Sequence, residues 1–136
     1  MELHALHWPP KELRLLLTRA GHSSFHAGQT IFREGDEGDR VYLIRRGLVE
    51  IFSDSHGHRQ RLALLGRGEV VGEMSVLDDL GRSATALART DVEMRELSKA
   101  DFEALLDREP MLVRRLTRQL SRRLRETQSV LLTEIE

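Results

Sequence analysis

Cysteine is absent from the 136 residues of this sequence, and long apolar runs are absent as well. Without cysteine the protein has no disulfide, no iron–sulfur cluster and no thiol catalysis. The longest apolar runs contain four residues, at 41–44 and 62–65. A membrane helix needs about 20 apolar residues, and a signal peptide needs an apolar core of about 7–15. We therefore expect a soluble, cytoplasmic protein without a membrane segment.

An excess of one charge is also missing, because 21 basic residues stand against 22 acidic ones and the net charge is -1. This balance argues against a general attraction to nucleic acid or to anionic membranes. Hydrophobic residues make up 40% and charged residues 32% of the chain, which is typical of a folded globular protein. The length fits one domain, so we expect residues 1–136 to form a single unit.

Three zones differ in their residue patterns. In residues 1–22, Trp8-Pro9-Pro10 precedes a leucine-rich segment, which predicts a helix with proline in its first turn. In residues 23–98, short apolar stretches alternate with turn residues, and eight of the ten glycines lie between or beside them. The predicted strands are 30–33, 41–46, 48–53, 59–65, 69–71, 85–88 and 92–98. The sequence therefore indicates a mainly β sandwich or closed barrel with flanking helices.

Residues 99–136 change to a helical period. A short helix is predicted over 99–107 with Ser98 as its N-cap, and a long helix is predicted from near Pro110. Its apolar stripe consists of Val113, Leu116, Leu120, Leu124, Thr127, Leu131 and Ile135. So long a stripe must be buried, either in a parallel homodimer, which we favour, or by folding back on its own domain. Because the chain ends within the stripe, we also expect a fragment of a larger protein.

One loop between two predicted strands carries polar chemistry, with Gly72, Glu73, Met74, Ser75 and Arg82. The glycine allows close approach of a ligand, and Met74 and Ser75 would present backbone N–H groups to an anion at the start of a short helix. The guanidinium of Arg82 fits two phosphate oxygens, and the carboxylate of Glu73 fits a sugar hydroxyl. The loop therefore suits a phosphate ester with a neighbouring hydroxyl. A purely structural Glu73–Arg82 ion pair fits equally well.

The segment 71–88 resembles the phosphate-binding cassette of the cyclic nucleotide-binding domain family, in which Gly-Glu precedes Arg-Ser-Ala. The segment 35–47 is similar to the same family's upstream signature, and the two occur in the family's order and separation. The resemblance extends over nearly the whole chain. It implies a jelly roll, also called a double-stranded β-helix, with an N-terminal helix and a long C-terminal helix.

The resemblance also implies roles for individual residues. Arg82 matches the arginine that binds the exocyclic phosphate oxygens, and Glu73 matches the glutamate that accepts from the ribose 2′-OH. Ser83 matches a position whose hydroxyl contacts the phosphate. The backbone lining of the site corresponds to Gly72, Met74 and Ser75.

A further match concerns the base of the nucleotide. Residues 122–128 are similar to the adenine-facing stretch of the catabolite-activator-protein branch, so Arg123 and Thr127 would face the base. Gln128 departs from the serine expected there. This match favours cAMP as the ligand and leaves cGMP possible. Leu62 and Leu64 are either an apolar wall for the base or plain core residues.

These matches predict a non-enzymatic regulatory domain that binds a cyclic nucleotide and signals by repositioning its C-terminal helix. It would be part of a transcription regulator or another larger signalling protein, and we expect no DNA-binding element within this chain. Two alternatives are a dimerisation module without a ligand and a metal-dependent jelly-roll enzyme. The second depends on His56-Gly57-His58, which we expect in a hairpin loop rather than inside the barrel.

Overall fold

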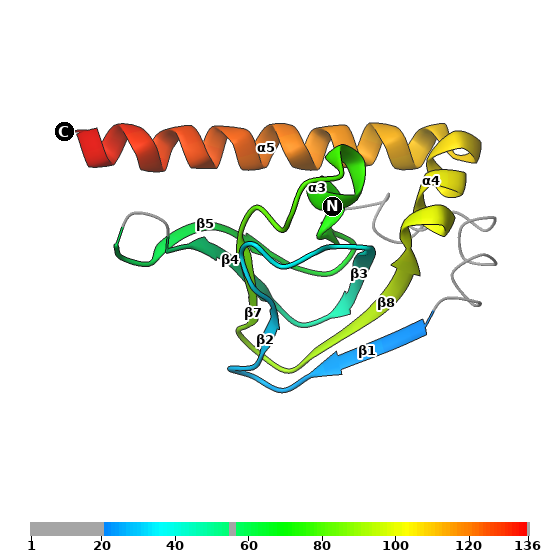
Figure 1. Cartoon of the computed structure of the whole chain (residues 1–136), viewed down its shortest axis with the longest axis horizontal. Helices are drawn as coiled ribbons and strands as arrows, with labels where there is room; N and C mark the ends of the chain where they lie inside the picture. Colours follow the sequence, from blue (N-terminus) through cyan, green and yellow to red (C-terminus); the bar gives the residue numbers. More distant parts are fainter. Residues whose placement is uncertain (1–20, 55–56, 136) are drawn as a thin grey trace, which may run out of the picture.

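The computed structural model describes residues 21–54 and 57–135, with side chains described as far as residue 126 (Figure 1). The helix predicted within residues 1–22 lies mostly in the part of the chain before residue 21, outside this description. The strands are β1 (Gly21–Phe25), β2 (Thr30–Phe32), β3 (Arg40–Arg46), β4 (Val49–Ser53), β5 (Gln60–Leu65), β6 (Val70–Val71), β7 (Thr85–Ala88) and β8 (Val92–Ser98). The helices are α3 (Glu73–Asp78), α4 (Lys99–Arg108) and α5 (Pro110–Ile135).

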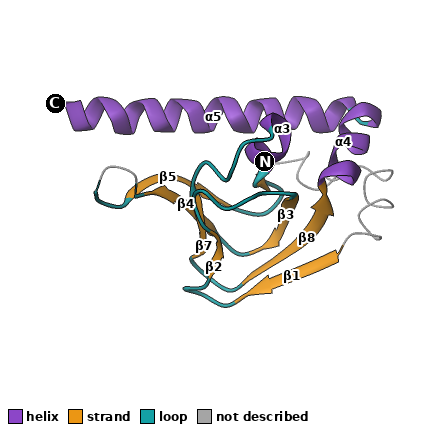
Figure 2. Ribbon diagram, in the orientation of Figure 1, coloured by secondary structure: helices purple, strands orange, loops and turns teal. Residues whose placement is uncertain are grey.

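The strands form two antiparallel four-stranded sheets, in the orders β1-β8-β3-β6 and β2-β7-β4-β5 (Figure 2). Most neighbours in each sheet are distant in sequence, as in a jelly roll. The inward-facing residues of both sheets form one apolar core, which includes Ile44, Val49, Leu65, Val71, Ala86 and Met94. Successive side chains of a strand point to opposite faces of its sheet, so one face of each sheet lies inside. The predicted mainly β fold with flanking helices is confirmed.

Strand β1 is the element that the sequence pattern did not predict. Its residues pair with β8, from Gly21 opposite Glu96 to Phe25 opposite Val92. Only Phe25 packs against the core, and the remaining residues are small or polar. Without an apolar–polar alternation, this segment carries no strand signal in its own sequence. Its pairing with β8 therefore decides its structure.

Helices α4 and α5 cover one end of the β1-β8-β3-β6 sheet through a second apolar cluster. In α4, the predicted cap is confirmed, because the Ser98 hydroxyl accepts a hydrogen bond from the backbone N–H of Asp101 (3.2 Å). The cluster joins the outer face of the sheet to both helices through Val41, Leu43, Val70, Leu97, Phe102, Leu105, Leu112 and Leu116. Among the described helices, none is long and apolar enough to cross a membrane.

The apolar stripe of α5 is wider than the face that packs on the domain. Leu116 is buried as predicted, but Leu112, outside the predicted stripe, is buried too. The predicted positions Val113 and Leu124 are 42% and 60% exposed. A helix turns about 100° per residue, so Val113 and Leu124 lie on one margin of the buried face. Among the described residues, none covers this apolar margin of α5.

Candidate functional site

The loop between β6 and β7 begins with a glycine that no other residue replaces without strain. Gly72 has φ 86°, in the left-handed region, and precedes the first turn of α3. A Cβ at this position would lie 2.4 Å from Nη1 of Arg82. Conformation and close packing therefore both require glycine here. The short helix predicted at this point in the sequence is confirmed as α3.

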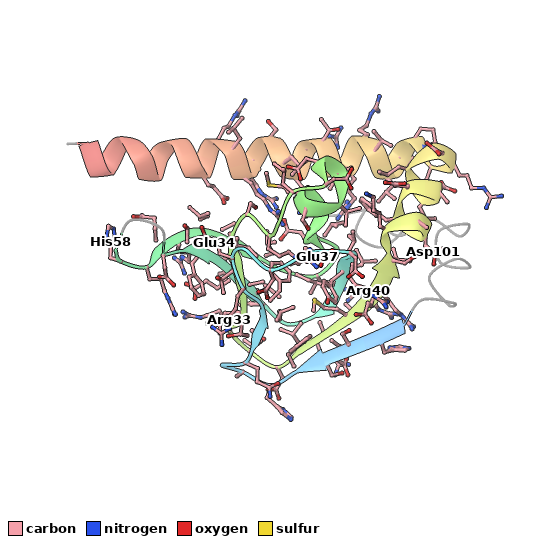
Figure 3. The ribbon with its side chains drawn as sticks, viewed as in Figure 1. Arg33, Glu34, Glu37, Arg40, His58 and Asp101 are labelled. Carbon is pink, nitrogen blue, oxygen red and sulfur yellow. The ribbon has the colours of Figure 1, made fainter. Side chains whose placement is uncertain are left out.

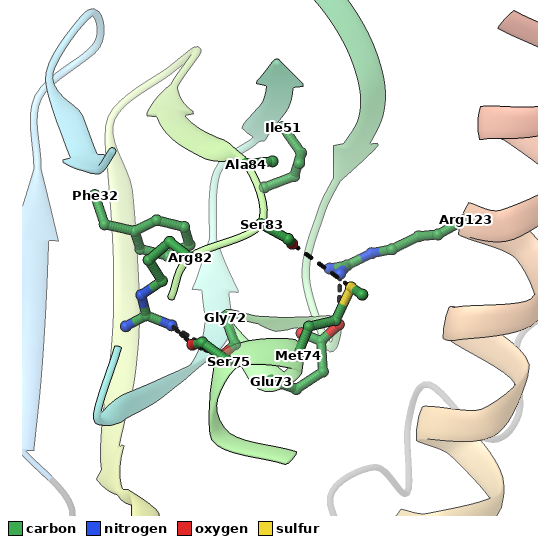
Figure 4. Close-up of a pocket in the computed structure, with 10 residues that line it drawn as sticks. All are labelled: Phe32, Ile51, Gly72, Glu73, Met74, Ser75, Arg82, Ser83, Ala84 and Arg123. Atoms are coloured by element: carbon green, nitrogen blue, oxygen red, sulfur yellow. Dashed lines mark hydrogen bonds and ion pairs between the residues drawn. The ribbon is translucent and has the colours of Figure 1, made fainter. Parts of the chain in front are cut away.

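The side chain of Arg82 is buried and extensively bonded to backbone (Figure 4). Its Nη1 donates to the carbonyl of Gly72 (2.8 Å) and to the hydroxyl of Ser75 (2.9 Å), and its Nη2 donates to the carbonyl of Arg40 (2.9 Å). The guanidinium carbon lies 4.1 Å from the ring centre of Phe32. The buried Nε has no hydrogen-bond partner. An arginine fixed in this way, with an unused donor, is suited to an anion.

The glycine-rich loop before β3 folds directly onto this arginine. The backbone N–H of Gly35 donates to the carbonyl of Arg82 (2.8 Å), and the N–H of Arg82 donates to the carbonyl of Asp36 (2.7 Å). A Cβ at Gly38 would lie 2.6 Å from Nε of Arg82. The segments 35–47 and 71–88, which carry the family resemblance, therefore pack against each other at Arg82. Burial lowers the pKa of Arg82, since the charged form has lost much of its hydration.

Glu73, the first residue of α3, is 0% exposed and pairs with the long C-terminal helix. Its Oε1 accepts a hydrogen bond from Nη1 of Arg123 (2.5 Å), while its Oε2 is buried without a partner. Burial raises the pKa of Glu73, and the nearby charge of Arg123 opposes this effect without cancelling it. Burial also disfavours the charged form of Arg123, and it therefore lowers the pKa of this arginine. Burying this ion pair away from water costs free energy. Because Oε2 has no partner, it is suited to accept a hydrogen bond from a hydroxyl group.

Other side chains of α5 fasten the helix to the strand that leads into this loop. The amide of Gln119 accepts from the N–H of Val70 (2.9 Å) and donates to its carbonyl (2.6 Å). Nη2 of Arg123 donates to the same carbonyl (2.6 Å), and Arg122 pairs with Glu69. Residues 69 and 70 are thereby bonded to α5 by side chains from two adjacent turns of the helix.

These residues surround a small cavity of about 30 Å³, roughly the volume of one water molecule. Seven predicted site residues line it, namely Gly72, Glu73, Met74, Ser75, Arg82, Ser83 and Arg123. The structure therefore brings together residues that are up to 51 positions apart in the sequence. Glu73 pairs with Arg123 and not with Arg82, so the structural ion pair considered from the sequence is not formed.

Three lining residues were not predicted, namely Phe32, Ile51 and Ala84. Phe32 belongs to β2, Ile51 belongs to β4, and Ala84 immediately precedes β7. In the sequence, only the alternation of side chains along each strand indicates that these residues face inward. Of the predicted residues, Thr127 belongs to α5, but its side chain lies outside the described part. Leu62 packs against the core and Leu64 is 44% exposed, and neither lines the cavity.

Of the two histidines considered for a metal, His58 lies on the loop between β4 and β5. Figure 3 labels His58 on this loop, beyond the ends of the strands, and its Nε2 lies 3.2 Å from Oε1 of Gln60. His56 is outside the described residues. Among the residues that the structure describes, no group of His, Cys, Asp and Glu has the arrangement of a metal site.

Comparison with known proteins gives consistent matches. A family model described as cyclic nucleotide-binding domain matches residues 22–109. The chain is 42% identical over 118 residues to the cyclic AMP receptor protein of Thermus thermophilus, covering 86% of this chain and 55% of that protein. The chain thus spans about half the length of this curated relative.

Solved structures agree with the sequence matches. The crystal structure of the Thermus thermophilus catabolite activator protein superposes with a TM-score of 0.75 at 39% identity, covering 93% of this chain and 61% of that chain. An EAL enzyme has been solved in a cAMP-bound form (TM-score 0.62, 34% identity) and in a cGMP-bound form (TM-score 0.63, 37% identity). These cover 80% and 82% of this chain, and 30% of that chain in both cases. The chain therefore belongs to the cyclic nucleotide-binding domain family, whose domain is a non-catalytic regulatory module.

Proposed function

We propose that this chain binds cAMP in preference to cGMP at the cavity beside α3, and that binding repositions α5. The observation that carries the proposal is the buried guanidinium of Arg82, which keeps an unpartnered Nε and lines the same cavity as the buried carboxylate of Glu73. In this assignment residues 1–136 act as one regulatory domain without catalytic activity of its own.

Arg82 would hold the cyclic phosphate. Three of its five N–H donors are used by the protein, on Nη1 and Nη2, so Nε and the second hydrogen of Nη2 remain for phosphate oxygens. A charge-assisted pair of this kind contributes about 1.5–3 kcal/mol. The hydroxyl of Ser83 and the backbone of residues 72–75 would complete the phosphate contacts, as the family resemblance implies.

Glu73 would accept a hydrogen bond from the ribose 2′-OH. Its Oε2 is buried and unpartnered, and a hydroxyl donor there satisfies an otherwise costly group. An acceptor-only carboxylate repels phosphate, so Glu73 and Arg82 together fix the direction in which the nucleotide enters. The adenine would then lie toward α5, near Arg123 and Thr127, and hydrogen bonding by Thr127 would favour adenine over guanine.

Binding would be transmitted to α5 because Arg123 of this helix lines the cavity in which the nucleotide would bind. The volume of the cavity is about 30 Å³, and Arg123 of α5 occupies one side of it while paired with Glu73. A ribose that engages Glu73 must share or displace Arg123. The free energy of that exchange biases the position of the helix, which is the condition for a ligand-driven change of conformation.

The uncovered apolar margin of α5 supports a homodimer. Val113 and Leu124 are exposed on a helix whose Leu112 and Leu116 pack on the domain. A parallel partner helix would bury this margin. The domain would then serve a larger protein such as a transcription regulator, in line with its coverage of 55% of the Thermus cyclic AMP receptor protein.

Calorimetric titration of one sample with cAMP and then with cGMP tests the proposal. We expect tighter binding of cAMP, and we expect Arg82→Ala to weaken cAMP binding at least ~10-fold, which is about 1.4 kcal/mol. Arg89→Ala, in an exposed arginine outside the cavity lining, is the matched control. Unchanged affinity in Arg82→Ala, or no binding of either nucleotide by the folded wild type, refutes the assignment.

A further inference from the structure

A hollow of about 510 Å³ lies on the outer face of the β1-β8-β3-β6 sheet, away from the cavity beside α3. Arg45 and Arg46 come from the end of β3, Arg67 from the turn between β5 and β6, and Arg95 from β8. Met94 belongs to the inner core, so the neighbouring Arg95 points to the opposite face of the strand. The hollow shares no lining residue with the cavity beside α3.

The charge of this arginine hollow is not balanced by the residues that the structure describes. Glu93 is the single carboxylate in its lining, and Arg46 holds it at 3.4 Å. With His22 neutral, four arginines and one glutamate give the lining a formal charge of +3, whereas the whole chain carries -1. Arg45 and Arg67 form no ion pair with a carboxylate of the described residues.

The polar groups of Arg95 are only partly satisfied by the described residues. Arg95 lies opposite His22 across the β1–β8 ladder, and its Nη1 contacts the ring nitrogens of that histidine, which supply no negative charge. Its Nε is buried without a hydrogen-bond partner. Burial and the positive charge of Arg45 both lower the pKa of Arg95. A cluster of like charges held this close is stabilised by a multivalent anion.

We propose that the arginine hollow binds an acidic segment of a partner protein. Pockets for small molecules enclose most of their ligand, whereas the arginines here are mostly exposed, with the Arg46 side chain at 77%. Arginines from two neighbouring strands and a turn line the same hollow, so that several carboxylates of one extended chain can pair with them. Four arginines are too few for stable binding of duplex nucleic acid, which typically neutralises roughly 6–10 phosphates.

A short peptide of aspartate and glutamate, labelled for fluorescence anisotropy, is the probe, and its asparagine–glutamine counterpart is the control peptide. We expect the acidic peptide to bind the intact chain at low salt, and binding to weaken as salt increases. The variant Arg45→Gln/Arg67→Gln removes two exposed charges of the hollow and should weaken binding about tenfold. The matched control Arg114→Gln/Arg118→Gln removes two exposed charges from α5.

Equal losses in the two double variants would mean general charge attraction and would overturn the proposal. Absence of peptide binding by the wild type, or binding of inorganic tripolyphosphate or a DNA duplex in its place, would overturn it as well. Titration of both variants with cAMP keeps this result separate from the proposed nucleotide site, because neither variant alters a residue lining that cavity.

Discussion

Replacing Arg123 by methionine tests the ion pair that joins α5 to the cavity. Glu73 is fully buried and the Arg123 side chain is 14% exposed, so the change leaves a carboxylate inside the protein without its cation. Breaking a buried pair from one side typically costs about 3–5 kcal/mol. We expect Arg123→Met to lower the free energy of unfolding by about 3 kcal/mol at about pH 8. Since domains are stable by about 5–15 kcal/mol, the variant should remain folded.

The size of this loss should depend on pH. Burial already raises the pKa of Glu73 above its ordinary value of 4.5, and Arg123 provides the largest opposing effect. A carboxyl group with a raised pKa binds its proton more tightly in the folded state. Its contribution to stability is therefore present below about pH 4.5 and is lost as the pH rises through the folded-state pKa. Arg123→Met raises that pKa further, so its destabilisation should be smaller at about pH 5 than at about pH 8.

Urea unfolding followed by circular dichroism, on the wild type, Arg123→Met, Glu73→Gln and the double variant, measures the coupling. The double variant should lose less than the sum of the two single changes, because it removes both charges. Arg122→Met is the matched control on the same helix. Its arginine is half-exposed and pairs with Glu69, so its removal should cost less than about 1 kcal/mol. Equal costs for Arg122→Met and Arg123→Met, or a loss for Arg123→Met that is the same at both pH values, would refute this reasoning.

Two further predictions concern the loop and the helix. Gly72→Ala should destabilise the protein by more than about 1 kcal/mol and weaken cAMP binding. Gly28→Ala is the control, because Gly28 also has a positive φ (91°) but no atom lies near the position of its Cβ. The loss of stability in Gly28→Ala therefore measures the cost of the positive φ alone. Similar unfolding curves for the two variants would show that contact with Arg82 is unimportant. If the proposed homodimer forms through α5, Leu124→Glu should raise its dissociation constant at least ~10-fold in sedimentation experiments, and an unchanged constant would exclude this margin of α5 as the interface.

Strands β2 to β8 and the cavity loop were predictable because their signals are local. Turn glycines bound the strands in the sequence, and Gly72, Glu73 and Arg82 lie within one connection between β6 and β7. Side chains that alternate along a strand reveal which face is buried, even without knowledge of the partner strand. The N-cap of α4 at Ser98 is local in the same sense. Each of these features needs only a few neighbouring residues to be recognised.

The remaining features depend on contacts between distant segments. Arg82 donates to the backbone carbonyl of Arg40, and a carbonyl oxygen is present at every residue, so no sequence pattern marks it. The partner of Glu73 lies 50 positions away on α5, and Arg82 was an equally reasonable partner by charge. The rotation of α5 about its axis decides between them. That rotation follows from the packing of Leu112 and Leu116 on the sheet. The apolar stripe in the sequence does not by itself determine which side of the helix packs there.

The attachments of α5 suggest how a ligand would move it. Glu69, Val70 and Glu73 all bond to side chains of α5, so helix and cavity are linked through one short segment. Arg123 lines the cavity, whereas Gln119 does not. A nucleotide that displaces Arg123 from Glu73 would therefore leave both hydrogen bonds of Gln119 in place. On the proposed function, the helix should pivot at Gln119 rather than detach, and the part beyond residue 123 should move most.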